Sequence, residues 1–175
     1  YSGIIEHQDT IIKKCIENMK SGSEKIEASA KELAISVKGK IPLIYSAQRM
    51  FCIAEKWKTD VNENAKTHAF YNMIPEFNHN ELCAYQSKNN NFHAIFLNDA
   101  KDHPRIKDRI EAFKKLVKPY NVPMTEIAIT GNDLLSRLMT GIWMGLFFSY
   151  YLALEYGIDP TPVEIIEKLK KELAK

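Results

Sequence analysis

Two polar segments near the middle of the chain hold the side chains with the clearest capacity for chemistry. The first ends in Asn62-Glu63-Asn64-Ala65-Lys66, and the second is Glu76-Phe77-Asn78-His79-Asn80-Glu81. Carboxylate and imidazole groups are the side chains that enzymes most often use for proton transfer near neutral pH. Both segments are more polar than a solvated surface requires, and Glu63 and His79 are candidates for such work by residue type alone.

Each candidate also has a structural interpretation. Glu63 falls in a helical pattern, where a glutamate is usually a solvated surface residue. His79 fits the start of a helix or a buried, hydrogen-bonded position, and the neighbouring Glu76 and Glu81 suggest a metal site. No second histidine lies at ligand spacing, so we expect no metal ion, and nothing in the sequence calls for a cofactor. Structural roles are expected for the other histidines and for four asparagines: His7, His68, His93, His103, Asn62, Asn64, Asn78 and Asn80.

The elements that must position these residues alternate between short apolar runs and helical patterns. Four runs predict buried strands: residues 41–45, 69–74, 92–97 and 125–130. Four longer patterns predict helices: residues 50–66, 104–117, 132–156 and 162–173. Parallel strands need crossover helices, so this alternation predicts an α/β fold, a three-layer αβα sandwich with a mostly parallel sheet. Ligands of such sheets bind beyond the carboxyl ends of the strands, so we expect the chemistry in the loops there.

Two further helical regions complete the prediction. Apolar residues recur at helical spacing within residues 1–38, but Ser21-Gly22-Ser23 supplies a stop followed by a new N-cap, so we expect two N-terminal helices. The run from Leu138 to Leu154 carries no charge, yet it is shorter than the roughly 20 apolar residues that a membrane span needs. We interpret it as a buried helix, with an apolar stripe that belongs to the core or to a dimer contact.

Composition restricts the class of protein. The 175 residues are 45% hydrophobic and 26% charged, which fits one globular domain without an internal boundary. The net charge of +2 is spread over interspersed acids and bases, so no nucleic-acid surface is expected. The three cysteines are widely spaced, which favours neither a disulfide framework nor a zinc site and suggests a reducing cytoplasm. The chain begins with Tyr1 and has no signal-peptide pattern, so we expect a fragment or a processed piece.

The two polar segments together resemble the signature of the bifunctional phosphoglucose/phosphomannose isomerases. The resemblance runs from about Ile41 to the end of the chain and includes Asp159-Pro160-Thr161-Pro162-Val163 followed by Lys168. It departs from the family at Lys56, where an arginine is usual, and at Met144-Gly145-Leu146, where Gly-Asp is usual. The resemblance implies a sugar isomerase domain with a flavodoxin-like fold over residues 1–175, forming the C-terminal half of a two-domain enzyme.

The resemblance also implies an activity and roles for four residues. The family interconverts glucose or mannose 6-phosphate with fructose 6-phosphate through a cis-enediol intermediate. Glu63 matches the base that moves a proton between C1 and C2, and His79 matches a ring-opening group that comes from the neighbouring subunit of a homodimer. Lys168 matches a second ring-opening and charge-stabilising group, and its alternative is a surface charge on an amphipathic terminal helix. Thr161 matches a threonine near C2 that leaves room for both epimers.

What the chain lacks limits that expectation. The family binds phosphate with a Gly/Ser/Thr-rich loop in its N-terminal half, and no such loop is found in this sequence. We therefore expect little or no turnover from this chain alone. Two alternatives remain open: a phosphosugar-binding sensor of the same fold, and a half that serves only in dimerisation. The expected partners are a sugar phosphate and a second subunit, without nucleic acid or membrane.

Overall fold

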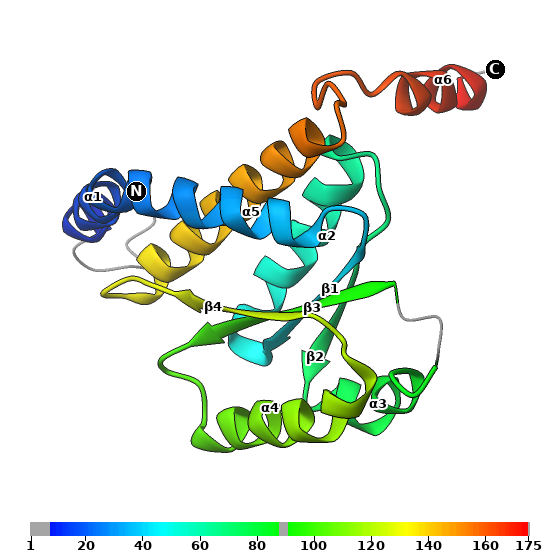
Figure 1. Cartoon of the computed structure of the whole chain (residues 1–175). Helices are drawn as coiled ribbons and strands as arrows, with labels where there is room; N and C mark the ends of the chain where they lie inside the picture. The colour runs from blue at the N-terminus through cyan, green and yellow to red at the C-terminus, as the bar shows by residue number, and fades with distance from the viewer. Residues whose placement is uncertain (1–7, 88–90, 175) are drawn as a thin grey trace.

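A parallel sheet forms the centre of the molecule. The computed structural model describes residues 8–87 and 91–174 (Figure 1). The strands are β1 (Ile41–Ala47), β2 (Phe70–Ile74), β3 (Phe92–Asp99) and β4 (Met124–Ile129). They pair in parallel in the order β2-β1-β3-β4, which is the order of a flavodoxin-like sheet through its fourth strand. The predicted α/β sandwich is confirmed.

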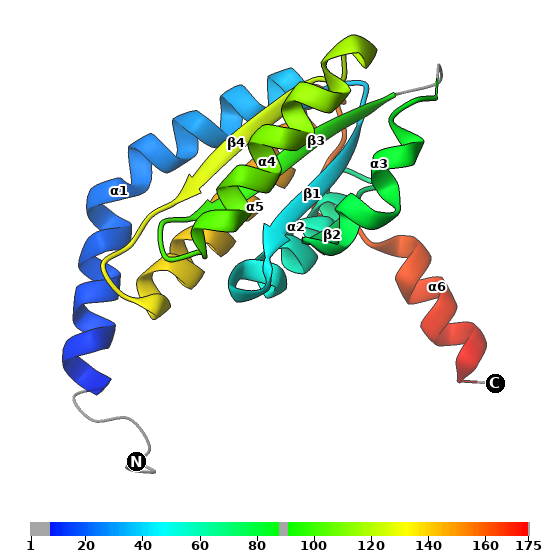
Figure 2. The same ribbon diagram turned by 90° about the horizontal axis from the view of Figure 1, so that it is seen from below.

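Helices cover both faces of the sheet. On one face lie α1 (Gln8–Val37), α2 (Phe51–Asn64) and α5 (Leu134–Glu155), and on the other lie α4 (Pro104–Val117) and the short α3 (Glu81–Ala84) (Figures 1 and 2). Because successive strand residues point to opposite faces, Ile44 and Ile95 enter the first core cluster while Tyr45 and Phe96 enter the second. Short 3₁₀ turns lie at Gln48–Met50, Glu76–His79 and Lys118–Tyr120.

Helix boundaries follow local chemistry. Pro104 occupies the first turn of α4, where its missing N–H costs no hydrogen bond, and α4 spans the residues that the sequence predicts. Asp133 caps α5 because its Oδ1 accepts from the Ser136 N–H at 2.8 Å. At the other end of α5, Gly157 has a φ of 66° and closes the helix with a conformation that glycine adopts without strain.

The prediction of two N-terminal helices was wrong. The chain runs as one helix, α1, through Ser21-Gly22-Ser23, and only residues 1–7 of the predicted region lie outside the described structure. Ser21 turns its hydroxyl back to the Asn18 carbonyl at 3.1 Å, so it does not cap a new helix. A glycine inside a helix costs about 1 kcal/mol, and packing of α1 along α5 outweighs that cost.

The apolar helix α5 packs against α1 and α2. Trp57 of α2 donates to the Gly141 carbonyl at 2.8 Å, and a Cβ added at Gly145 would lie 2.3 Å from the Trp57 ring. The glycine at the segment that departs from the family therefore permits close approach of the two helices. Among the described helices α5 alone has the length and apolarity to cross a membrane, but 44% of its most apolar window is buried within the fold. As predicted, α5 packs into the core, but only one side of it is buried, and its outer stripe is exposed at Leu146, Tyr150 and Leu154.

The last helix, α6 (Glu164–Leu173), extends away from the rest of the molecule (Figures 1 and 2). Its apolar residues remain in contact with solvent, with Ile165 80% and Leu173 79% exposed. An amphipathic helix normally buries such a stripe. The described part of the chain therefore does not supply the surface that would cover α6.

Candidate active site

The fold separates Glu63 from His79. Helix α2 returns from the carboxyl end of β1 to the amino end of β2, so Glu63 in its last turn lies at the amino edge of the sheet. His79 follows β2 and lies at the carboxyl edge. Strands of 5 to 8 residues, at about 3.3 Å per residue, put these edges roughly 17–26 Å apart. One copy of the chain does not bring both side chains to one reacting carbon, and of the two only His79 lies at the carboxyl edge, where the sequence predicts the chemistry.

Glu63 borders a cavity at the amino edge. This cavity of about 420 Å³ is lined by Asn62, Glu63 and Lys66 from the end of α2, and by residues 162–166 from the start of α6. The Glu63 side chain is exposed. Burial that would remove this carboxylate from water is not supplied by the described part of the chain.

Thr161 lies in a turn beside the same cavity. Its N–H donates to Asp159 Oδ1 at 2.9 Å, and this hydrogen bond is the main reason that the pKa of the Asp159 carboxyl is lowered. Thr161 is exposed and directly precedes a residue that lines the cavity. The structure thus places Glu63 and the Thr161 segment on two sides of one opening.

Lys66 connects those two sides. Its ammonium group donates to the Glu63 carbonyl and to the Pro160 carbonyl, the second at 3.2 Å. Sequence reasoning treated Lys66 only as part of the motif, because a lysine after a helix usually carries a surface charge. Lys168, in contrast, lies exposed on α6 and extends with that helix away from the sheet.

His79 lies beside a hydrogen-bonded cluster that fixes the carboxyl edge of β2. Glu81 accepts from the Tyr45 hydroxyl and from the Asn72 amide, both at 2.6 Å, with one bond to each carboxylate oxygen. Burial is the main cause that raises the pKa of Tyr45 above its usual range. Glu81, which suggested a metal ligand, is therefore committed to structural hydrogen bonds, and His79 is exposed at its side.

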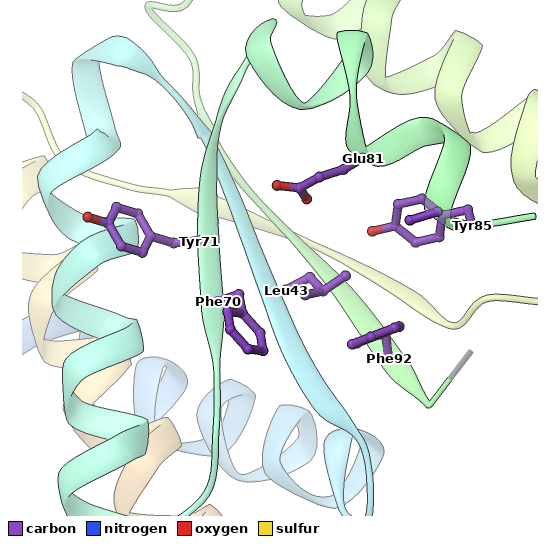
Figure 3. Close-up of a pocket in the computed structure, with 7 residues that line it drawn as sticks. Leu43, Phe70, Tyr71, Glu81, Tyr85 and Phe92 are labelled. Carbon is purple, nitrogen blue, oxygen red and sulfur yellow. The ribbon is translucent and has the colours of Figure 1, made fainter. Parts of the chain in front are cut away.

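A second cavity lies under α3, on the face of the sheet opposite to Glu63. Figure 3 shows its apolar floor, made by Leu43, Phe70 and Phe92 from three adjacent strands, and the polar groups of Glu81 and Tyr85 above it. Its volume is about 290 Å³. None of the four predicted site residues lines it, so we do not assign the chemistry to this cavity.

The asparagines mostly have the structural roles that the sequence predicts. Asn62 donates to the Thr67 carbonyl at 2.8 Å, and Asn80 accepts from the Glu81 N–H at the start of α3. Asn64 instead joins α2 to α5 through the Ser149 hydroxyl at 2.8 Å. Asn78 has a buried Oδ1 without a hydrogen-bond partner among the described residues.

Sequence reasoning also missed Asp60, which lies one turn before Glu63. Its side chain is buried, its Oδ1 accepts from Lys56, and its Oδ2 has no partner among the described residues. Burial raises the pKa of the Asp60 carboxyl, and the Lys56 ammonium opposes that effect. The i,i+4 spacing of Lys56 and Asp60 was the signal that could have identified the pair.

Comparison with known proteins identifies the family. A sequence model of the bacterial phospho-glucose isomerase C-terminal SIS domain matches residues 26–173. This chain belongs to that family.

Curated relatives of this SIS domain are about twice as long as the segment they share with it. A bifunctional phosphoglucose/phosphomannose isomerase of Aquifex aeolicus is 36% identical over 161 residues, which cover 91% of this chain and 50% of the relative. The Caldicellulosiruptor bescii protein of the same name is 33% identical, over 98% of this chain and 54% of its own length. The chain therefore spans about half the length of the curated relatives it matches.

A solved structure agrees with the fold of the SIS domain. The glucose-6-phosphate isomerase like protein from Thermus thermophilus superimposes with a TM-score of 0.72 at 20% identity. The match covers 94% of this chain and 56% of that protein. At this identity the likeness shows the fold, the arrangement of sheet and helices, alone.

Proposed function

We propose that this chain is the C-terminal, base-bearing half of an aldose–ketose isomerase that interconverts glucose 6-phosphate, and mannose 6-phosphate, with fructose 6-phosphate. The observation that supports it most directly is the shared opening between Glu63 and the turn that holds Thr161. Membership of the SIS-domain family and the names of the relatives support the class of substrate. Cytoplasmic location is part of the proposal.

Glu63 is the base in this proposal. Its carboxylate removes the proton from C2 of the open-chain aldose, and the electrons of that C–H bond form the C1=C2 double bond of a cis-enediol. A proton moves from O2 to O1, and the protonated Glu63 then returns its proton to C1, so that the ketose forms with no net change in atoms. General acid–base groups of this kind contribute about 10²–10⁴-fold to a rate. Thr161, a small residue beside the opening, leaves space for either configuration at C2.

His79 and Lys168 open the sugar ring and stabilise charge on the oxygens. The separation of the two edges supports a homodimer in which the His79 of one subunit serves the Glu63 of the other. Lys168 reaches the site when α6 packs against a surface that residues 8–87 and 91–174 do not provide. Its ammonium group then donates to an oxygen that becomes negative in the transition state.

The N-terminal half found in the longer relatives completes the site. It supplies the phosphate contacts and the water exclusion that the open cavity at Glu63 lacks, and this requirement agrees with a chain that covers only half of those relatives. This chain alone is expected to fold and to turn over sugar phosphate slowly or not at all.

A coupled assay of fructose 6-phosphate conversion tests the proposal. We would fuse this chain to the N-terminal half of the Aquifex relative, and also mix the two halves as separate polypeptides. Turnover is expected from the fusion or the associated mixture and not from this chain alone. Glu63→Gln should lower kcat/KM by about 10²–10⁴-fold without loss of folding. Glu55→Gln, the same substitution on the same helix, should leave turnover unchanged.

The alternative is a sensor that binds phosphosugar without converting it. The exposure of Glu63 and its distance from His79 are the observations that favour it. A folded, associated pair of halves that binds fructose 6-phosphate but shows no turnover, with binding unaffected by Glu63→Gln, would replace the isomerase proposal by the sensor.

A further inference from the structure

Lys66 has a backbone conformation that its side chain does not favour. It follows the last turn of α2 with a φ of 52°, in the left-handed region. Glycine is the usual residue at this position after a helix, because a Cβ strains the backbone there. A positive φ does not by itself call for a long charged side chain, so the presence of lysine requires another explanation.

The contacts of the Lys66 ammonium group supply that explanation. It donates to the Glu63 carbonyl in the last turn of α2 and, at 3.2 Å, to the Pro160 carbonyl. Within the described parts of the chain, the second bond is the hydrogen bond that joins residues 159–171 to the remainder of the molecule. A lysine that merely neutralised the end of the helix dipole would account for the first bond and not for the second.

We infer that Lys66 is a positioning residue, which holds the segment carrying Thr161 and leading to α6 at a fixed place relative to Glu63. The inference rests on the proposed isomerase function for its catalytic consequence and on geometry alone for its structural part. The Asp159 carboxylate fixes the Thr161 N–H at 2.9 Å on one side of Pro160, and Lys66 fixes the Pro160 carbonyl itself. The two contacts together set where Thr161 lies beside the cavity.

Three substitutions separate the backbone from the side chain at this position. Lys66→Gly suits the positive φ and removes the ammonium group, Lys66→Met keeps the aliphatic stem without the charge, and Lys66→Arg keeps a cation that can donate to both carbonyls. A residue with only a capping role would lose nothing on replacement by glycine. A residue that holds the Thr161 segment loses that function in the glycine and methionine variants alike.

The first measurement is the rate of amide hydrogen exchange in this chain, with NMR as the detection method. We expect the Thr161 N–H to exchange about three- to tenfold faster in the Gly and Met variants, the size expected when modest solvent-exposed hydrogen bonds are lost. The thermal midpoint of Lys66→Gly should equal or exceed that of the unmodified chain, and Lys66→Arg should restore slow exchange. Unchanged exchange in the Gly and Met variants would overturn the inference, whatever the catalytic result.

The second measurement is steady-state kinetics in the fusion with the Aquifex N-terminal half. We expect kcat to fall about tenfold or less in the Gly and Met variants, with KM little changed and partial recovery in Lys66→Arg. Faster exchange with full kcat would show that the contact has no catalytic consequence, and the inference would then be wrong. A fusion without any turnover would count against the proposed function, while the exchange data would still decide whether Lys66 holds the segment.

Discussion

The two edges of the sheet satisfy their charged groups in opposite ways. At the carboxyl edge, between β1 and β3, the Asp99 side chain is fully buried, and Arg137 Nε lies 3.2 Å from both of its oxygens. Arg49, which follows β1, approaches the same carboxylate at 3.8 Å. At the amino edge, Glu63 faces solvent without an ion-pair partner among the described residues, and the exposed Thr161 contacts only the Asp159 carboxylate of its own turn.

This difference shows which edge of the sheet pairs its charged groups within the described chain and which edge does not. The junction of β1 and β3 is the switch point at which open α/β sheets usually bind ligands, yet here it holds an internal ion cluster. Buried charges that are paired within the fold are held by their partners, and breaking such a pair leaves an uncompensated charge. In the proposed function, the groups at the amino edge remain available to a second subunit or to an N-terminal half, and the open edge is the one that carries the chemistry.

The largest stability effect is expected at the closed edge. Asp99→Asn leaves the buried Arg137 guanidinium without its carboxylate, and breaking a buried pair in this way costs about 3–5 kcal/mol. Urea unfolding of the two proteins measures the loss. Arg49→Met is the control, because Arg49 is 46% exposed and its pairing should contribute less than about 1 kcal/mol. Equal, small losses in both variants would show that the cluster does not close this edge.

A pH-dependent effect is expected beneath the open edge, at His93. Its side chain is buried near the amino end of β3, with Nε2 2.8 Å from the Thr125 hydroxyl. Burial is the main cause that lowers the pKa of His93, and Lys40 acts in the same direction. Below the unfolded value of about 6.5 the unfolded chain binds the proton more tightly, so stability falls as the pH drops, by at most about 1.4 kcal/mol per pH unit.

The measurement for His93 is urea unfolding at pH 7.5 and pH 5.5. His93→Gln keeps a donor for Thr125 and cannot be protonated, so its loss of stability between the two pH values should be smaller than that of the unmodified chain. His68, which is exposed, provides the control as His68→Gln. An identical pH dependence in the His93 variant and the unmodified chain would show that the buried histidine does not cause the loss of stability at low pH.

The elements of the fold were predictable because their apolar runs and end signals are local. The strand that begins at Ile41 and the helix from Pro104 to Val117 follow from branched residues and a proline at the first turn. The N-terminal helices were not predictable in number, since Gly22 is a weak local signal that packing against α5 overrides. Tertiary contacts of this kind are not visible in a single segment.

The sequence nominates residues for the candidate site, but it does not predict how the fold arranges them. A motif placed Glu63 and His79 close in sequence, whereas the return of α2 along the sheet puts them at opposite edges. The contact between Lys66 and Pro160 requires a left-handed turn at Lys66 and joins residues 94 positions apart in the sequence. A lysine in the sequence predicts neither the turn nor the contact. The exposure of α6 was not predictable either, because the sequence does not show that the described residues supply no surface to cover its apolar stripe.

The smallest effect is expected at Asp60, where the open edge carries a cost of its own. Burial raises the pKa of its carboxyl, so the folded state favours the protonated form, and the ionised form destabilises the fold as pH rises through that pKa. Asp60→Asn should therefore increase stability at pH 7, by less than about 1 kcal/mol, and the gain should vanish near pH 3.5. Lys56 is 42% exposed, so its ammonium group remains hydrated without the partner.

The matched variant for Asp60 acts in the opposite direction. Lys56→Met removes the group that opposes the raised pKa, so stability at pH 7 should fall, and urea unfolding at both pH values measures the pair. A loss of stability in Asp60→Asn that is equal at pH 7 and pH 3.5 would mean that the hydrogen bond to Lys56 outweighs the cost of the buried charge. The ion pair near the amino edge would then stabilise the fold, as the pair at the carboxyl edge does. The contrast between the two edges would rest on Glu63 and Thr161 alone.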